Sequence, residues 1–148
     1  MWQRIRQIKE ILDHPVNCDN KISAFIKYLK WNVGRRLLDR ADYAINIAPS
    51  VQLILSNREN YATLAYPCGL SAFAALPFLA HYLRPSDIFG DFGANVGVYS
   101  VLAGSFGATV LSVEPVPDTY ARLQRNLLLN SVKGRAVQCG LSDSIGIL

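Results

Sequence analysis

Residues 91–100, with the sequence Asp-Phe-Gly-Ala-Asn-Val-Gly-Val-Tyr-Ser, constrain the fold of this chain more than any other feature. They follow a short apolar run and open into a helical pattern. Gly93 and Gly97 permit a sharp turn and let a ligand approach the backbone where a Cβ would otherwise stand. Asn95 lies between them, and asparagine is among the few residues other than glycine that tolerate a left-handed backbone. The segment therefore predicts the first strand–turn–helix unit of an α/β fold of the nucleotide-binding type.

The sequence continues this alternation of strand and helix. We expect strands at residues 88–92, 109–114 and 136–141, and helices at residues 95–106 and 118–130, the second capped by Asp118. Short connections between such elements predict a parallel sheet. Ligands of open α/β folds bind at the edge where the carboxyl ends of the strands lie. We therefore expect residues 91–97, Glu114 and residues 140–143 to meet at that edge.

Glu114 follows the second expected strand, 21 residues after Gly93. An acid there can hold both hydroxyls of a ribose in charge-assisted hydrogen bonds, and it would repel the 2′-phosphate of NADP. A dinucleotide fingerprint would need glycine where this chain has Asn95 and Val98. The Asn95 side chain would crowd a diphosphate but not S-adenosylmethionine, which carries no phosphate. The turn therefore predicts an S-adenosylmethionine site and disfavours an NAD-linked oxidoreductase.

The basic charge lies in the N-terminal part of the chain. Residues 1–40 hold nine lysines and arginines against four acids, whereas the whole chain has a formal net charge of +4. Basic residues interleaved with aromatic ones can bind a membrane surface or nucleic acid. Because apolar stripes are the ordinary pattern of packed helices, we favour a helical cap with solvated lysines, and we expect no nucleic-acid partner.

Two helices are expected in this region, at residues 2–12 and from a cap at Asp19 or Asn20 to about residue 38. The apolar stripe that should pack on the main domain consists of Ile22, Phe25, Ile26, Leu29, Val33 and Leu37. We treat residues 1–50 as a basic helical lead-in and residues 51–148 as a partial α/β domain.

Between these parts, residues 51–55 and 61–66 are expected to form a β-hairpin around the polar residues 56–60. An apolar helix at about residues 71–83 follows. It is too short to span a bilayer and contains Pro77, so no transmembrane segment is predicted.

The three cysteines, Cys18, Cys68 and Cys139, show neither a metal-binding spacing nor a disulfide framework. Reduced thiols in a cytoplasmic protein are the simplest interpretation, and the N-terminus lacks the apolar stretch of a signal peptide. No metal site is predicted.

Residues 91–100 resemble the Asp-x-Gly-Ala-Asn-x-Gly-x-Tyr-Ser/Thr signature of FkbM-type S-adenosylmethionine-dependent methyltransferases. The resemblance continues through Glu-Pro-Val-Pro at residues 114–117 and through a Leu-x-x-Asn-x-x-x-Asn pattern at Leu123, Asn126 and Asn130. It ends with Leu-Ser-Asp-Ser-Ile-Gly at residues 141–146.

This resemblance is specific over residues 83–146 and suggestive over residues 10–82. Two positions depart from the family pattern. Gly90 stands where the family usually has a large aliphatic residue, and Phe92 replaces a small β-branched one. Neither is expected to touch the cofactor.

The resemblance implies a Rossmann-like class I methyltransferase fold that binds S-adenosylmethionine. The methionine part of the cofactor would be surrounded by the turn residues Gly93, Ala94, Asn95 and Gly97. Asp91 would lie beneath the turn near the ammonium group. Glu114 would hold the ribose.

The same resemblance places Tyr99 and Ser100 at the start of a helix, whose backbone N–H groups favour the cofactor carboxylate. Ser142 and Asp143 would lie beside the adenine. The catalytic base is not identified, because His14 and His81 lie away from the motif and are expected to be structural.

The implied activity is methyl transfer to an oxygen of a small-molecule or glycan acceptor. Family members continue with further strands, so we expect this chain to be a fragment or truncated product whose sheet ends after its third strand. Alone it should bind the cofactor weakly and turn over nothing. The alternative is a non-catalytic assembly module, in which the half sheet self-associates or pairs with a partner through the open edge of residues 88–92.

Overall fold

The computed structural model describes residues 2–37, 42–56, 68, 75–144 and 146. Its helices are α1 (Trp2–Leu12), the 3₁₀-helix η1 (Pro15–Asn17), α2 (Lys21–Leu37), α4 (Leu76–Tyr82), α5 (Val98–Ser105) and α6 (Pro117–Leu129). Its strands are β1 (Asp42–Ala48), β2 (Val51–Ser56), β3 (Ile88–Phe92), β4 (Thr109–Val113) and β5 (Gly134–Val137).

The predicted parallel sheet is confirmed. Strands β3, β4 and β5 lie side by side in that order, and both pairs are parallel. Strand β3 has the expected bounds. Strand β5 begins two residues earlier than expected and ends at Val137, because it pairs with β4 from Val110 opposite Gly134 to Val113 opposite Val137.

The two helices of the α/β unit differ from the prediction at their N-terminal ends. The first begins later than expected, and the second has a different N-cap. Helix α5 begins at Val98 rather than near residue 95, because the turn occupies the residues before it and Gly97 forms the N-cap. Helix α6 begins at Pro117 with Val116 as its N-cap, so Asp118 lies in the first turn and is not the cap. Proline at this position fits the start of a helix, since its missing N–H has no helical partner there.

The first strand of the predicted hairpin, β2, has a partner that the sequence analysis does not expect. Strand β2 pairs with β1, antiparallel, through the two-residue connection Pro49-Ser50. Residues 61–66, the expected partner, lie outside the described residues. The domain division after residue 50 thus falls between two paired strands, and it remains a prediction.

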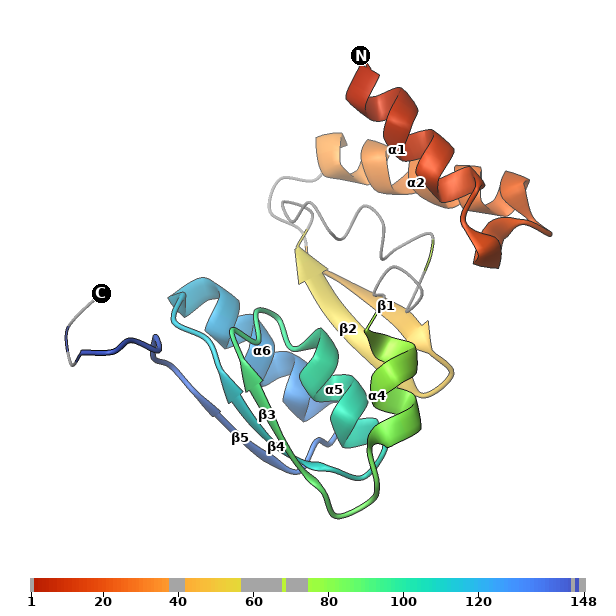
Figure 1. The fold of residues 1–148 in the computed structure, drawn as a ribbon. Helices are drawn as coiled ribbons and strands as arrows, with labels where there is room; N and C mark the ends of the chain where they lie inside the picture. The colour runs from red at the N-terminus through yellow and green to blue at the C-terminus, as the bar shows by residue number, and fades with distance from the viewer. Residues whose placement is uncertain (1, 38–41, 57–67, 69–74, 145, 147–148) are drawn as a thin grey trace.

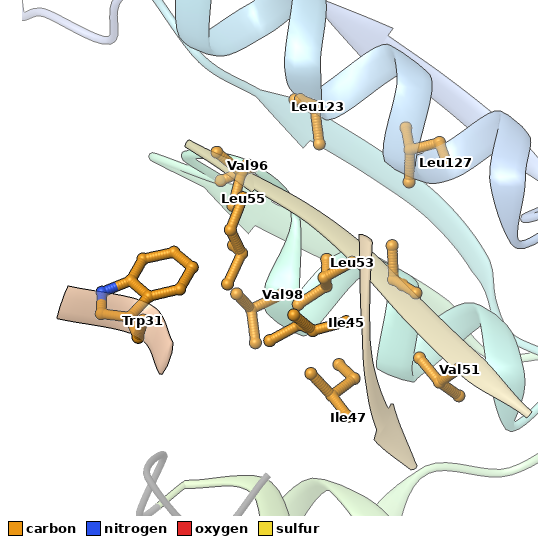
Figure 2. Close-up of a cluster of buried hydrophobic side chains, with 12 residues drawn as sticks. Trp31, Ile45, Ile47, Val51, Leu53, Leu55, Val96, Val98, Leu123 and Leu127 are labelled. Atoms are coloured by element: carbon orange, nitrogen blue, oxygen red, sulfur yellow. The ribbon is translucent and has the colours of Figure 1, made fainter. Parts of the chain in front are cut away.

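Helices α5 and α6 lie between the parallel sheet and the β1–β2 hairpin (Figure 1). The hairpin contributes its alternate apolar residues to a cluster with these helices, and Figure 2 shows Leu53 and Leu55 in the same cluster as Leu123 and Leu127 of α6. The main core is formed by Trp31, Ile45, Ile47, Val51, Leu53, Leu55, Ala94, Val96, Val98, Val101, Leu123 and Leu127. The candidate turn therefore inserts Ala94 and Val96 directly into this core.

Helix α2 turns the opposite face inward from the one predicted. Ala24 and Tyr28 pack against α1, and Trp31 reaches the main core. The expected apolar stripe is exposed, with Ile22 and Leu37 each 77% accessible. Helix α2 therefore packs through its aromatic face. Asn20 caps it, since its Oδ1 accepts a hydrogen bond of 3.0 Å from the Ser23 N–H.

Strand β3 carries the two departures from the family pattern on one face. A Cβ at Gly90 would lie 3.1 Å from the ring of Phe92, so the ring occupies the space beside the glycine. Phe92 is 60% exposed and Ile88 is 82% exposed. In the described part of the chain β3 pairs with β4 alone, so it is an edge strand there.

No helix within the described ranges is both long and apolar enough to cross a membrane.

Candidate functional site

The turn between β3 and α5 is built from three residues with positive φ. These angles are 82° at Gly93, 52° at Asn95 and 87° at Gly97. The left-handed backbone expected at Asn95 is confirmed. The N–H groups of Gly93 and Ala94 both donate to the Val113 carbonyl at 2.9 Å, so the end of β4 holds the start of the turn.

The two glycines of the turn serve different purposes. A Cβ at Gly97 would lie 2.6 Å from Cδ1 of Leu123, so glycine is required for α6 to pack closely. A Cβ at Gly93 would have no heavy atom within 4 Å. Gly93 therefore leaves open space beside the backbone, which is the room that a ligand against this turn would need.

Glu114 holds the turn from the neighbouring strand. Its side chain is buried, and Oε2 accepts a hydrogen bond of 2.9 Å from the Asn95 N–H. Oε1 accepts one of 3.0 Å from the Val116 N–H. A carboxylate offers about four acceptor positions, so each oxygen keeps one for a ligand hydroxyl. The structure thus brings Glu114 and the turn together, as the sequence predicts.

Asp91 lies beneath the turn in a buried polar cluster. The Ser100 hydroxyl donates to Oδ2 of Asp91 at 2.5 Å and lies 2.7 Å from the Ser112 hydroxyl. Burial raises the pKa of the Asp91 carboxyl above its ordinary value, and the hydrogen bonds from Ser100 offset part of that rise. The cluster joins β3, α5 and β4 directly below the candidate site.

This cluster also shows what the sequence reasoning missed. Ser112 was not among the candidate residues, although it is the only serine in an otherwise apolar strand end and is fully buried. A polar residue inside a buried strand was the available signal, because such groups need a hydrogen-bond partner. The Ser100 hydroxyl and backbone N–H both bond the Asp91 carboxyl, so Ser100 acts on the turn by holding Asp91 against the start of α5.

Tyr99 is half-buried in the first turn of α5. The first N–H groups of a helix have no partner within it, so this end of α5 favours a negative group. Gly97 precedes it as the N-cap.

Ser142 and Asp143 are not joined to the rest of the site. Both are exposed, and within the described residues the Ser142 hydroxyl donates to Oδ1 of Asp143 at 3.3 Å and accepts from the Ser144 N–H at 3.4 Å. Their expected position beside the adenine remains a prediction.

A hollow of about 310 Å³ lies at the opposite end of the sheet, lined by the first residues of the strands and their neighbours. Ile88, Thr109 and Gly134 begin their strands there. Ligands of parallel sheets bind at the carboxyl ends, so this hollow is not the candidate site. Among the described residues no group of three or more His, Cys, Asp or Glu could hold a metal ion.

No family model matches the chain. The 31-O-demethyl-FK506 methyltransferase FkbM of Streptomyces tacrolimicus is 40% identical over 67 residues, which are 44% of this chain and 26% of that protein. Methyltransferase sdnD of Sordaria araneosa is 44% identical over 69 residues, 43% of this chain and 27% of that protein. The chain is similar to FkbM-type methyltransferases. It spans about a quarter of the length of these relatives.

Solved structures show the same fold. Pyrococcus horikoshii TYW2, crystallised in complex with MeSAdo, matches with a TM-score of 0.57 at 15% identity, over 95% of this chain and 66% of that chain. The Pyrococcus abyssi tRNA (uracil-54, C5)-methyltransferase, in complex with S-adenosyl-L-homocysteine, matches with a TM-score of 0.55 at 14% identity, over 70% of this chain and 25% of that chain. The predicted Rossmann-like methyltransferase fold is confirmed.

Proposed function

We propose that this chain forms the cofactor-binding part of an S-adenosylmethionine-dependent methyltransferase of FkbM type. The observation that carries the proposal is the hydrogen bond from the Asn95 N–H to the Glu114 carboxylate, which joins a left-handed turn and an acid at the carboxyl ends of adjacent strands. The similarity to named methyltransferases supports the same activity.

The residues present fit this cofactor. The open space beside Gly93 gives room for the methionine part, and the remaining acceptor positions of Glu114 suit the two ribose hydroxyls. The proposed cofactor-binding residues are Asp91, Gly93, Ala94, Asn95, Gly97, Tyr99, Ser100, Glu114, Ser142 and Asp143.

Bound S-adenosylmethionine supplies an activated methyl group on a sulfonium centre. The task left to the chain is to hold the acceptor oxygen in line with that group, and alignment of this kind can contribute several kcal/mol. Glu114 and the turn fix the nucleoside and methionine ends. Asp91 remains a buried acid beneath the turn, where its hydrogen bond to Ser100 keeps the start of α5 in place.

For the acceptor, we propose a hydroxyl group of a glycan or a natural product. One relative is named as a 31-O-demethyl-FK506 methyltransferase, which supports an oxygen acceptor. A cytoplasmic location belongs to the same proposal and is supported by the reduced, exposed thiols of Cys18 and Cys139.

Calorimetric titration of the chain with S-adenosylmethionine tests the cofactor assignment. We expect Glu114→Ala to weaken binding by about 30-fold or more, because charge-assisted hydrogen bonds to the ligand and the restraint on Asn95 are lost together. Asp118→Ala, which removes an exposed carboxyl in the first turn of α6, should leave the affinity unchanged. Absence of binding by the unmodified chain, or full affinity in Glu114→Ala, would falsify the proposal.

A second candidate function, a non-catalytic assembly module, is favoured by the exposed edge strand β3. Ile88 and Phe92 present apolar side chains there. In this case the chain should self-associate without binding S-adenosylmethionine. Size-exclusion chromatography with light scattering, combined with the titration above, distinguishes the two functions, since an S-adenosylmethionine-binding monomer would rule out the assembly module.

A further inference from the structure

Asn126 on α6 is fully buried, although its side chain is polar. It is not one of the proposed cofactor-binding residues. Its carboxamide makes three hydrogen bonds. Nδ2 donates to the Val96 carbonyl at 2.7 Å and to the Ile54 carbonyl at 3.1 Å, and Oδ1 accepts from the Ile54 N–H at 2.6 Å. A buried amide with this many partners is strongly fixed in position, because each lost partner leaves a desolvated group unpaired.

Asn130 lies one helical turn later and binds the same strand. Its Oδ1 accepts from the Gln52 N–H at 2.9 Å, and its Nδ2 donates to the Gln52 carbonyl at 2.7 Å. Four residues of helix rise about 6 Å, and two residues of strand span about 6.8 Å. The two amides therefore match alternate residues of β2 and pair with its edge as a neighbouring strand would.

The two asparagines differ in one contact. Asn126 reaches the turn through the Val96 carbonyl, whereas the third hydrogen bond of Asn130 is to the Asn126 carbonyl, at 2.8 Å. Glu114 holds the N–H of the adjacent residue, Asn95. Successive residues of the turn are thus held by two side chains, one from the sheet and one from α6.

We propose that Asn126 is a positioning residue for cofactor binding. It holds the turn in its ligand-binding conformation and fixes that turn to the edge of the β1–β2 hairpin. The inference rests on the proposed function for its effect on S-adenosylmethionine affinity, but the restraint on the turn can be measured without any ligand.

The test compares Asn126→Ala with Asn130→Ala, which loses the same kind of contact to β2 but none to the turn. S-adenosylmethionine affinity is measured by calorimetric titration below the unfolding temperatures of both variants. We expect Asn126→Ala to weaken binding by about 10-fold or more, the effect of one buried hydrogen bond, and Asn130→Ala by less than about 2-fold. Equal losses in the two variants would overturn the proposal.

Amide hydrogen exchange of the ligand-free chain provides the second measurement. The amides of Asn95 and Gly97 should exchange about 10-fold faster in Asn126→Ala than in Asn130→Ala, because only the first variant releases the turn. Unchanged exchange at these amides would also overturn the proposal. If the unmodified chain binds no S-adenosylmethionine, the proposed function fails, and the exchange rates alone then decide whether Asn126 restrains the turn.

Asn126→Ser and Asn130→Ser form a milder pair for the case in which the alanine variant does not fold. The serine hydroxyl can still donate one hydrogen bond. We expect the same differences between the two serine variants, in S-adenosylmethionine affinity and in amide exchange, but smaller than between the alanine variants. If neither measurement shows a difference, Asn126 is not a positioning residue.

Discussion

Helices α2 and α6 are both amphipathic, yet only α6 buries its regularly spaced aliphatic residues. Leu123 and Leu127 of α6 are buried in the core, whereas Leu128 is 81% exposed. In α2 the predicted stripe faces solvent, and Tyr28 and Trp31 are buried instead. Helix α6 lies between the sheet and the hairpin, whereas α2 lies at the outside of the molecule (Figure 1). A helix with neighbours on two sides has its orientation set by both of them.

The comparison also shows that two large aromatic side chains can outweigh a longer apolar stripe. Tyr28 and Trp31 each bury a large area at a small cost in side-chain entropy. The ion pair of α2 between Lys21 and Asp13, at 3.6 Å, is exposed, so it does little to fix the rotation of the helix. Helix α6, in contrast, is held by Asn126 and by the ion pair between Arg125 and Asp42 of β1, at 2.6 Å.

The largest effect is expected from removing the aromatic contact of α2. Trp31 is 3% exposed, and its ring lies 5.4 Å from that of Tyr43 on β1. We expect Trp31→Ala to lower the free energy of unfolding by about 3–5 kcal/mol. Leu29→Ala, on the exposed stripe, should cost about 1 kcal/mol or less. Urea denaturation measures both, and a larger loss in Leu29→Ala would show that α2 packs through the predicted stripe after all.

An intermediate effect is expected where α6 meets the turn. Gly97→Ala should cost about 2–4 kcal/mol, because its methyl group would meet Leu123 and the backbone angle is left-handed. Gly93→Ala has a similar φ but faces open space, so it should cost only about 1–2 kcal/mol. Its methyl group should instead weaken S-adenosylmethionine binding. Urea denaturation measures the loss of stability in both variants, and calorimetric titration measures their S-adenosylmethionine affinity. Equal losses of stability in the two variants would contradict the prediction.

The smallest effect concerns the buried acid of the α/β unit, which has no counterpart in α2. Burial raises the pKa of Asp91 in the folded chain above the ordinary value of 3.8. The folded chain then binds more protons than the unfolded chain, so this group's contribution to stability is fully present below about pH 3.8 and is lost as the pH rises through the folded-state pKa.

Asp91→Asn removes this dependence. We expect the variant to gain stability relative to the unmodified chain as the pH rises through that window, and the difference to become constant above it. Denaturation at a series of pH values measures the difference, with Asp143→Asn as an exposed control. A difference that does not change with pH would mean that Asp91 has an ordinary pKa.

The α/β unit was largely predictable because its signals are local. Glycines and asparagine at fixed spacing place the turn, and the turn-forming sequence Arg-Pro-Ser-Asp at residues 84–87 marks the start of β3. The pairing of β2 with β1 was not predicted, although Tyr43, Ile45 and Ile47 alternate toward the core and the turn Pro49-Ser50 follows them. That alternation was a sufficient signal, but it lay across the expected domain boundary.

Other features could not be predicted from the sequence. The buried cluster of Asp91, Ser100 and Ser112 joins three separate elements, and no spacing along the chain reveals that contact. The rotation of α2 depends on what covers each face, because both faces carry apolar residues. Asn126 and Asn130 were visible as a pattern, but their pairing with β2 required the strand to be placed first.

The Phe92 ring occupies the space beside Gly90. The two departures from the family pattern on β3 are therefore a single exchange of side-chain volume between neighbouring positions. The family pattern has a bulky side chain at the first position and a small one at the second, and this chain has the reverse. The two sites should therefore evolve together. Among close relatives, a branched aliphatic residue at position 90 should be accompanied by a smaller residue at position 92, since both cannot be large on the same stretch of surface.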